Sequence, residues 1–199
     1  PEKPLVESDW NLNAKSPLLY SKITAEKWAS QFCLENDIQL VNILPPTIIG
    51  PNFYKVTPST LFYKKMLLGE LLAIPEGGCH LVDVRDVAQA HLNAFISETA
   101  KGRYIVAGEF FKFSDFFLFV KKLKRELKFY HLDAPNWLLQ IFRFFDWINH
   151  SLTKKSRLLT GEMIRDFTNK YQYVSAEKAI HEIHWKPRPA EQSILDTFL

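Results

Sequence analysis

Only two segments of this chain have the pattern of buried sheet strands, Ile38–Leu44 and Arg103–Ala107. The first is short, rich in β-branched residues and bounded by Asn36-Asp37 and Pro45-Pro46, which favours a buried strand of a parallel sheet. Two strands do not make a stable open sheet. We therefore expect the neighbouring strands to precede Pro1, so that the chain is a piece of something longer.

Helical periodicity and capping residues predict the helices around these strands. Ser16 is an N-cap candidate and Pro17 suits the first helical position, which predicts a helix over 17–35. Asp83 caps a second helix that runs to about Ile96, and Asp86 places a carboxylate in its first turn. The alternation of helices and strands predicts an α/β fold with a parallel sheet. The other predicted elements are helices over 59–68, 114–123, 135–151, 160–166, 175–184 and 190–199, short strands over 71–74, 80–82 and 127–132, and a loop over 45–58.

Composition excludes several classes of function. The 25 basic and 22 acidic residues give a net charge of +3, too balanced to indicate nucleic-acid binding. The two cysteines, Cys33 and Cys79, fit no metal or redox motif, which predicts reduced thiols and a cytosolic compartment. No segment reaches the roughly 18 apolar residues of a membrane span. The nearest, Trp137–Ile148, is interrupted by polar residues, so we expect no integral membrane segment.

Five local patterns occur along the chain in one order. They are Ser21-Lys22 before Ala25-Glu26-Lys27, the strand that runs into Pro45–Pro51, Leu81–Ala88, Gly102–Gly108, and Ser175–Ala179 before Trp185–Pro189. In this order they resemble the extended short-chain dehydrogenase/reductase family, the NAD-dependent epimerase/dehydratase group. Within it the chain is most similar to the dihydroflavonol-reductase-like and hopanoid-associated sugar-epimerase-like branch. The resemblance covers essentially the whole chain.

The resemblance implies the C-terminal part of a Rossmann-like fold with a smaller, helix-rich substrate lobe. Residues 1–45 and 80–108 would remain from the dinucleotide-binding domain, and residues 46–79 and 109–199 would form the lobe. In the family, an N-terminal βαβ half carries the glycine-rich turn that seats the cofactor pyrophosphate. None of the 7 glycines here forms that motif. We expect that half, with the family's catalytic serine or threonine, to be absent. NAD or NADP would be the cofactor of the intact protein.

The family's chemistry requires a tyrosine four residues before a lysine, because residues at this spacing share one helix face. The lysine lowers the tyrosine pKa and holds the nicotinamide ribose, while the tyrosine exchanges a proton with the substrate. Lys22 matches the lysine, but Leu18 stands four residues before it. Tyr20 is two residues from Lys22, roughly 200° around a helix.

Three alternatives follow from this broken pair. In the first, catalysis is altered or lost. In the second, the segment is not a regular helix and Tyr20 takes the place of the missing tyrosine. In the third, another residue supplies the proton. The resemblance keeps Lys22 as a ribose contact and makes Lys22 and Tyr20 the catalytic candidates.

Other candidates flank the predicted strand ends. Pro45 and Thr47 would flank the nicotinamide, because ligands of open α/β sheets bind beyond the carboxyl ends of the strands. The predicted substrate contacts are Phe53, Tyr54, Ser59, Phe62 and Arg85. Arg85 has an alternative, a salt bridge with Asp83 or Asp86 at the helix start. His181 and His184 flank Glu182, but a metal site would need a further ligand and none is nearby, so we predict no metal.

The intact protein is therefore expected to be an NAD(P)-dependent reductase, dehydratase or epimerase. It would act on a carbonyl or hydroxyl carbon of a sugar-nucleotide-like or hydrophobic small molecule. Leu18 puts its catalysis in question, and the alternative is an inactive relative that binds a ligand or a partner. The chain alone is expected to be inactive. The resemblance also implies a homodimer through a four-helix bundle that includes the helix near Pro17. The apolar helix near 136–151 is a lobe core or lid, or it docks on a membrane surface or an apolar substrate.

Overall fold

Helix α1 (Pro17–Glu35) confirms the first predicted helix in this computed structural model. Its start is fixed by Ser16, whose side chain accepts a hydrogen bond from the Leu19 amide at 3.2 Å. Pro17 occupies the first turn, where its missing N–H costs nothing. Asp37, at φ 54°, then turns the chain away. The structure describes residues 3–14, 16–53, 61, 64, 65, 68, 73–123, 132–154, 157, 161, 164, 165 and 168–198.

The two predicted buried strands pair with each other. Strands β1 (Val41–Leu44) and β5 (Gly102–Ile105) run parallel, with Val41 opposite Gly102 and Leu44 opposite Ile105. Helix α3 (Val84–Ile96) precedes β5 and packs on β1, as a parallel crossover requires. The predicted α/β architecture with parallel pairing is therefore confirmed.

A second sheet contains the strand predicted over 80–82 and two strands that the sequence did not reveal. Strands β2 (Thr47–Ile49) and β4 (Gly78–Asp83) are parallel, and β6 (Phe110–Lys112) is antiparallel to β4. The loop predicted over 45–58 is thus wrong at β2. Strand β2 has only three residues after two prolines, so it shows no alternation of polar and apolar residues. Its pairing partner is β4, which is distant in sequence.

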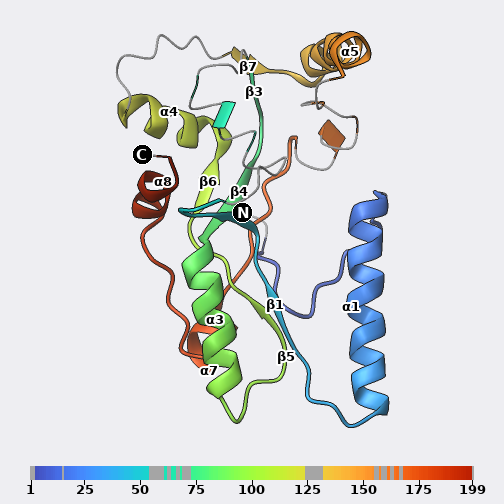
Figure 1. Cartoon of the computed structure of the whole chain (residues 1–199), viewed down its shortest axis with the longest axis vertical. Coiled ribbons are helices and arrows are strands. Elements are labelled where there is room, and N and C mark those ends of the chain that lie inside the picture. Colours follow the sequence, from blue (N-terminus) through green and yellow to red (C-terminus); the bar gives the residue numbers. More distant parts are fainter. Residues whose placement is uncertain are drawn as a thin grey trace.

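The remaining elements form the upper part of the molecule in Figure 1 and the C-terminal region. Strand β3 (Ala73–Pro75) pairs with β7 (Leu132–Ala134), and helices α4 (Phe113–Leu123) and α5 (Asn136–Thr153) follow β6 and β7. Helices α7 (Glu177–Glu182) and α8 (Ala190–Phe198) end the chain. The helices predicted over 59–68 and 160–166 and the strand over 127–132 lie largely outside the described residues.

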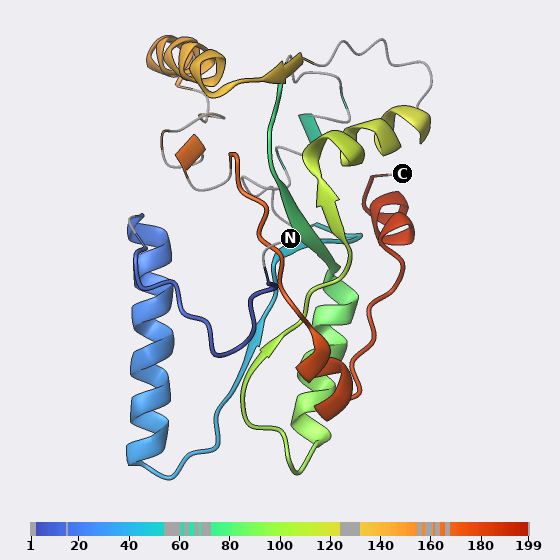
Figure 2. The ribbon, with the colours of Figure 1, turned by 180° about the vertical axis from the view of Figure 1, so that it is seen from behind.

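Two buried clusters hold these elements together. One joins α3 and β5 to α7 and Trp185, with Tyr104, Ala90 and Val106 at its centre. The other packs β2, β3 and β4 against α4 and α8, through residues such as Ile49, Phe116, Phe117, Val120 and Ile194. Figure 2 shows α8 beside the strand β6 and α4, and α7 beside α3. The C-terminal residues are therefore part of both cores.

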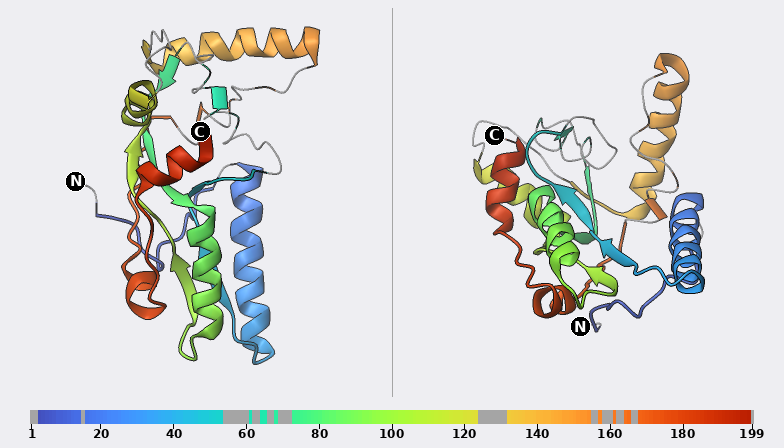
Figure 3. Two further views of the ribbon diagram at one scale, coloured as in Figure 1. Left: turned by 60° about the vertical axis from the view of Figure 1, so that its left-hand side comes forward. Right: turned by 60° about the horizontal axis from the view of Figure 1, so that its bottom comes forward.

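Helix α1 is attached differently, by polar contacts rather than by burial. None of its residues is buried. Arg103 on β5 holds it: its Nε donates to Glu26 Oε1 at 2.8 Å, and its guanidinium lies 3.9 Å from the Trp10 ring centroid. Arg103 also donates to the Glu7 carbonyl, so it binds the N-terminal segment as well. Figures 1 and 3 show α1 standing to the side of β1 and β5.

Trp185 provides a test of the first core. The side chain is 1% exposed, and its Nε1 donates to the Asp86 carbonyl at 2.8 Å. Trp185→Phe keeps much of the ring but removes this donor, so the free energy of unfolding should fall by about 1–3 kcal/mol. Trp185→Ala should cost about 3–5 kcal/mol. Urea denaturation measures both.

The matched control is Trp147→Phe, at a position that is exposed on α5. It should leave the unfolding midpoint unchanged. An equal loss of stability in the Trp147 and Trp185 variants would show that burial and the Asp86 contact do not set the effect.

Candidate functional site

The amino-terminal half of α1 carries the predicted catalytic positions. The helix is regular from Pro17, so Leu18 and Lys22 share one face and Tyr20 lies roughly 200° around from Lys22. Leu18 is 64% exposed and Tyr20 is 63% exposed. A role for Tyr20 beside Lys22 would need an irregular segment, and the backbone here provides none. The face that presents Lys22 therefore presents a leucine one turn before it.

The carboxyl end of β1 places the predicted cofactor contacts. Pro45 directly follows β1, and Thr47 opens β2, with both residues half-buried. The Thr47 hydroxyl donates to Cys79 Sγ at 3.5 Å. Phe53 is exposed after β2. Tyr54, Ser59 and Phe62, the other predicted substrate contacts on this segment, lie outside the described residues.

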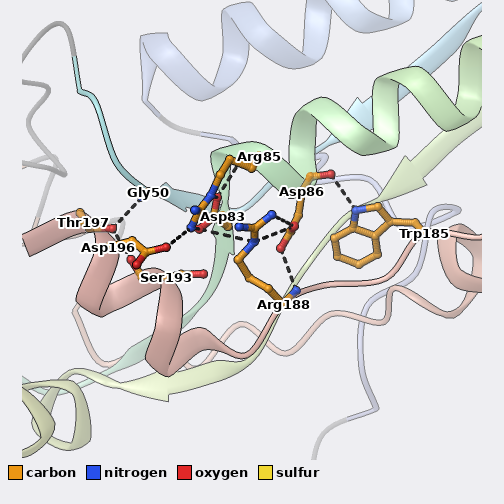
Figure 4. Close-up of polar contacts among 9 residues, drawn as sticks. All are labelled: Gly50, Asp83, Arg85, Asp86, Trp185, Arg188, Ser193, Asp196 and Thr197. Carbon is orange, nitrogen blue, oxygen red and sulfur yellow. Dashed lines mark hydrogen bonds and ion pairs between the residues drawn. The ribbon is translucent and has the colours of Figure 1, made fainter.

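Arg85, predicted near a substrate, lies between two carboxylates (Figure 4). Its Nη2 lies 2.7 Å from Asp83 Oδ2 and 2.6 Å from Asp196 Oδ2, and its Nε donates to Asp83 Oδ1 at 2.8 Å. The alternative predicted for this residue, a salt bridge with Asp83 at the helix start, is the arrangement that the structure shows. The contact with Asp196 on α8 is additional.

A second arginine completes the group from the other side. The backbone N–H of Arg188 donates to Asp86 Oδ2 at 2.8 Å, and its Nε donates to Asp86 Oδ1 at 2.9 Å. The same guanidinium lies 3.7 Å from Asp83 Oδ2. Nearby, the Gly50 amide donates to Thr197 Oγ1 at 2.7 Å, which ties β2 to α8. We call the set Asp83, Asp86, Arg85, Arg188 and Asp196 the carboxylate–arginine cluster; Figure 4 shows how its members face one another.

The cluster holds Asp83 in its charged form. Burial opposes ionisation, but hydrogen bonds from the Arg85 side chain and backbone and from Ser193, with the positive charge of Arg188, outweigh it. The pKa of the Asp83 carboxyl is therefore below its ordinary value. On Arg85 the same contacts raise the guanidinium pKa, the bond to Asp83 being the largest cause.

The buried polar atoms of the carboxylate–arginine cluster are paired within the protein. Among the described residues, no buried side-chain nitrogen or oxygen lacks a hydrogen-bond partner. The side chains of Arg85 and Arg188 remain partly exposed, at 37% and 30%. The contacts of the cluster hold α3, β4 and α8 together.

A larger cavity lies elsewhere. It has a volume of about 620 Å³ and is lined by Lys3, Leu5, Lys112 and the segment 169–173. None of the predicted site residues lines it. Among the described residues, no group of three or more His, Cys, Asp or Glu side chains could hold a metal ion. His181 and His184 are therefore left without further ligands in that part of the chain.

Sequence reasoning found part of the carboxylate–arginine cluster. It recognised Asp83 and Asp86 as helix-start carboxylates and gave Arg85 a salt bridge with one of them. It missed their partners Arg188, Ser193 and Asp196. No local pattern pairs Arg188 with Asp86, because the two residues are 102 positions apart.

The described residues fit a dinucleotide cofactor only in part. The contacts expected for a ribose and a nicotinamide are at Lys22 and at the carboxyl end of β1. No pyrophosphate cradle accompanies them in the described ranges. Two glycines allow close packing inside the protein. A Cβ on Gly50 would lie 2.6 Å from Val84, and a Cβ on Gly108 would lie 2.4 Å from the Leu81 carbonyl oxygen.

Comparison with known proteins finds reductases among the relatives of the chain. No protein-family model matches the chain. The chain is 33% identical over 122 residues to cinnamoyl-CoA reductase CAD2 of Medicago truncatula, covering 60% of this chain and 36% of that protein. It is 38% identical over 94 residues to anthocyanidin reductase of Arabidopsis thaliana, covering 43% and 28%.

The chain is thus similar in sequence to plant reductases, which agrees with its resemblance to the extended short-chain dehydrogenases/reductases. The crystal structure of gox2253 superposes with a TM-score of 0.77 at 23% identity, covering 98% of this chain and 59% of that chain. Gre2 of Candida albicans in complex with NADPH gives 0.66 at 23% identity, covering 96% and 55%. These likenesses confirm the predicted Rossmann-like fold. The chain spans about a third of the length of the curated relatives that it matches.

Asp83→Asn tests the carboxylate–arginine cluster. Because the folded-state pKa is below the ordinary 3.8, the Asp83 contribution to stability is complete above about pH 4 and disappears as the pH falls further. The variant should lose about 2–3 kcal/mol at neutral pH. The difference from the wild type should shrink below pH 4.

Denaturation at a series of pH values measures this difference. Glu98→Gln, at an exposed turn, is the matched control and should show no such effect. A stability difference for Asp83→Asn that stays constant down to acidic pH would contradict the assignment of a low pKa.

Proposed function

We propose that the protein that carries this chain is an NAD(P)-binding relative of the reductases and epimerases in which tyrosine-dependent proton transfer has been lost. The observation that carries the proposal is Leu18, one turn before Lys22 on a regular, exposed helix. The similarity to reductases and the NADPH in the Gre2 structure support the cofactor class. In this proposal residues 1–45 and 80–108 belong to the nucleotide-binding domain, and 46–79 and 109–199 to the substrate lobe.

Lys22 and Leu18 on α1 differ in what they can contribute to cofactor binding and to proton transfer. The Lys22 ammonium is exposed on the helix and can donate hydrogen bonds to the hydroxyl groups of a ribose. The Leu18 side chain has no ionisable group, so it neither donates a proton to a carbonyl oxygen nor removes one from a hydroxyl. The pair thus retains a binding function without the acid–base function.

The substrate in this proposal is a small molecule with a carbonyl or hydroxyl carbon, sugar-nucleotide-like or hydrophobic. Its contacts would come from the segment of Phe53, Ser59 and Phe62. Arg85 is held by Asp83 and Asp196, so it would position α3 rather than contact the substrate. Binding of such a ligand does not require a proton donor at position 18.

Leu18→Tyr, made in the protein that carries this chain, tests the proposal. A tyrosine there stands one turn from Lys22, which supplies the missing proton donor. Consumption of NADPH with a panel of aldehydes and ketones should rise by about 100-fold or more over the wild type, the usual contribution of a general acid. The absorbance of the reduced nicotinamide measures it.

Two variants control this experiment. Leu18→Phe adds the ring without the hydroxyl and should stay at the wild-type level. Leu18→Tyr combined with Lys22→Met should lose the gain. If the wild type already turns over and Leu18→Tyr adds nothing, another residue supplies the proton and the proposal fails.

The fit of the described residues to only part of a dinucleotide gives a further prediction. The 199-residue chain alone should bind NADP and NADPH more weakly than roughly millimolar, because its sequence has no glycine-rich motif for the pyrophosphate. Isothermal titration calorimetry measures this. Micromolar binding by the isolated chain would show that these residues form a complete cofactor site.

A further inference from the structure

The cavity of about 620 Å³ lies where three segments far apart in the sequence meet: the start of the chain, β6 and the segment 169–173. Among the residues that line it are Lys3, Lys112, Lys170, Tyr171 and Tyr173, and we call it the lysine-lined cavity. Figure 2 shows the start of the chain beside the segment that leads to α7. Sites for small molecules have volumes of about 300–1,000 Å³, so this cavity is large enough for one.

Backbone hydrogen bonds hold the walls of the lysine-lined cavity in place. The Leu5 amide donates to the Tyr173 carbonyl at 2.9 Å, and the Gly78 amide donates to the Lys170 carbonyl at 3.0 Å. On its other side, Gly78 pairs with Lys112 in the ladder between β4 and β6. The three segments are thus fixed relative to one another without a ligand, and small-molecule sites are in general largely preformed.

The lining of the cavity is positively charged. In the described part of the chain it contains Lys3, Lys112 and Lys170 and neither an aspartate nor a glutamate. No described carboxylate forms an ion pair with any of these three ammonium groups. The carboxylate of Glu76 is close by, where it accepts a hydrogen bond from the Tyr171 hydroxyl at 3.1 Å. Three ammonium groups around one cavity favour an anion with more than one negative charge.

Two tyrosine rings line the cavity beside these charges. The ring of Tyr173 packs against the ring of Phe110, with 4.3 Å between the centroids, and Tyr173 remains 37% exposed. Burial and the hydrogen bond to Glu76 raise the pKa of the Tyr171 hydroxyl, so this side chain stays neutral. Aromatic side chains stack on planar rings. The lining therefore suits a ligand in which a planar ring is joined to the anionic group.

We propose that the lysine-lined cavity binds an aryl phosphate, a small molecule in which a planar aromatic ring bears a phosphate monoester. The phosphate lies among Lys3, Lys112 and Lys170, and the ring lies against Tyr173. A phosphate monoester has about 1.5–2 negative charges at neutral pH, so it matches three ammonium groups better than a single carboxylate does. None of the predicted cofactor or substrate contacts lines this cavity, so the inference does not depend on the catalytic fate of α1.

Isothermal titration calorimetry of the protein that carries this chain tests the inference, with phenyl phosphate as the probe. Phenyl phosphate should bind saturably and more tightly than either inorganic phosphate or benzyl alcohol, and salt should weaken its binding. Lys112→Ala with Lys170→Ala should weaken binding by about tenfold or more, because two charged contacts are lost. Tyr173→Leu should weaken the binding of phenyl phosphate and leave that of inorganic phosphate unchanged.

The matched control is on α4. Lys121 and Lys122 are exposed in the last turn of that helix, so Lys121→Ala with Lys122→Ala removes the same charge away from the cavity. This control should bind phenyl phosphate as the wild type does. Saturation with NADP should also leave the binding unchanged, because the predicted cofactor contacts are elsewhere. Unfolding curves should show that each variant is folded.

Several results would overturn the inference. One is the absence of saturable binding of phenyl phosphate to the wild type. Another is an equal loss of binding in the α4 variant and in the cavity variant, which would show that only the overall charge matters. Displacement of the probe by NADP, with full binding retained in the cavity variant, would place the probe in the cofactor site instead. Equal binding of phenyl phosphate and inorganic phosphate, unaffected by Tyr173→Leu, would contradict the assignment of an aryl group.

Discussion

Two carboxylates at the start of α3, Asp83 and Asp86, hold segments that are far apart in the sequence. Arg85 bridges Asp83 to Asp196 on α8, and Arg188 binds Asp86 through both its backbone and its side chain. A buried carboxylate without these partners would be costly, so the two arginines and the two aspartates have to be in place together. The cluster determines where α8 closes on β2 and β4.

The local signals of the sequence account for much of the fold. Ser16 with Pro17, and Asp83 with its first-turn carboxylate, determine where α1 and α3 begin, because capping depends on neighbouring residues only. Strands β2 and β6 could not be predicted in this way. Each has three residues, and pairing with β4 defines them. The contact of Arg188 with Asp86 joins residues 102 positions apart, and no local pattern announces it.

The sequence predicts individual residues of the candidate site, but not the contacts that those residues make with distant segments. The Leu18 and Lys22 spacing follows from helix geometry, and the regular α1 bears out that geometry. Arg85 could be placed near a cleft only by resemblance, and its carboxylate partners give it a structural role. The same holds for α5, whose sequence is apolar nearly all round. Only the structure separates the face that packs on Ile164 from the exposed apolar residues of this helix. No described helix, α5 included, is long and apolar enough to cross a membrane.

The central claim is that α1 keeps a binding lysine and lacks a proton donor. The most direct measurement pairs NADPH binding with NADPH consumption in the wild-type protein that carries this chain. The account predicts saturable binding that Lys22→Met weakens, with no consumption of the cofactor in the presence of aldehydes or ketones. Consumption at ordinary enzymatic rates, about 1 per second or faster, that Lys22→Met abolishes would contradict it.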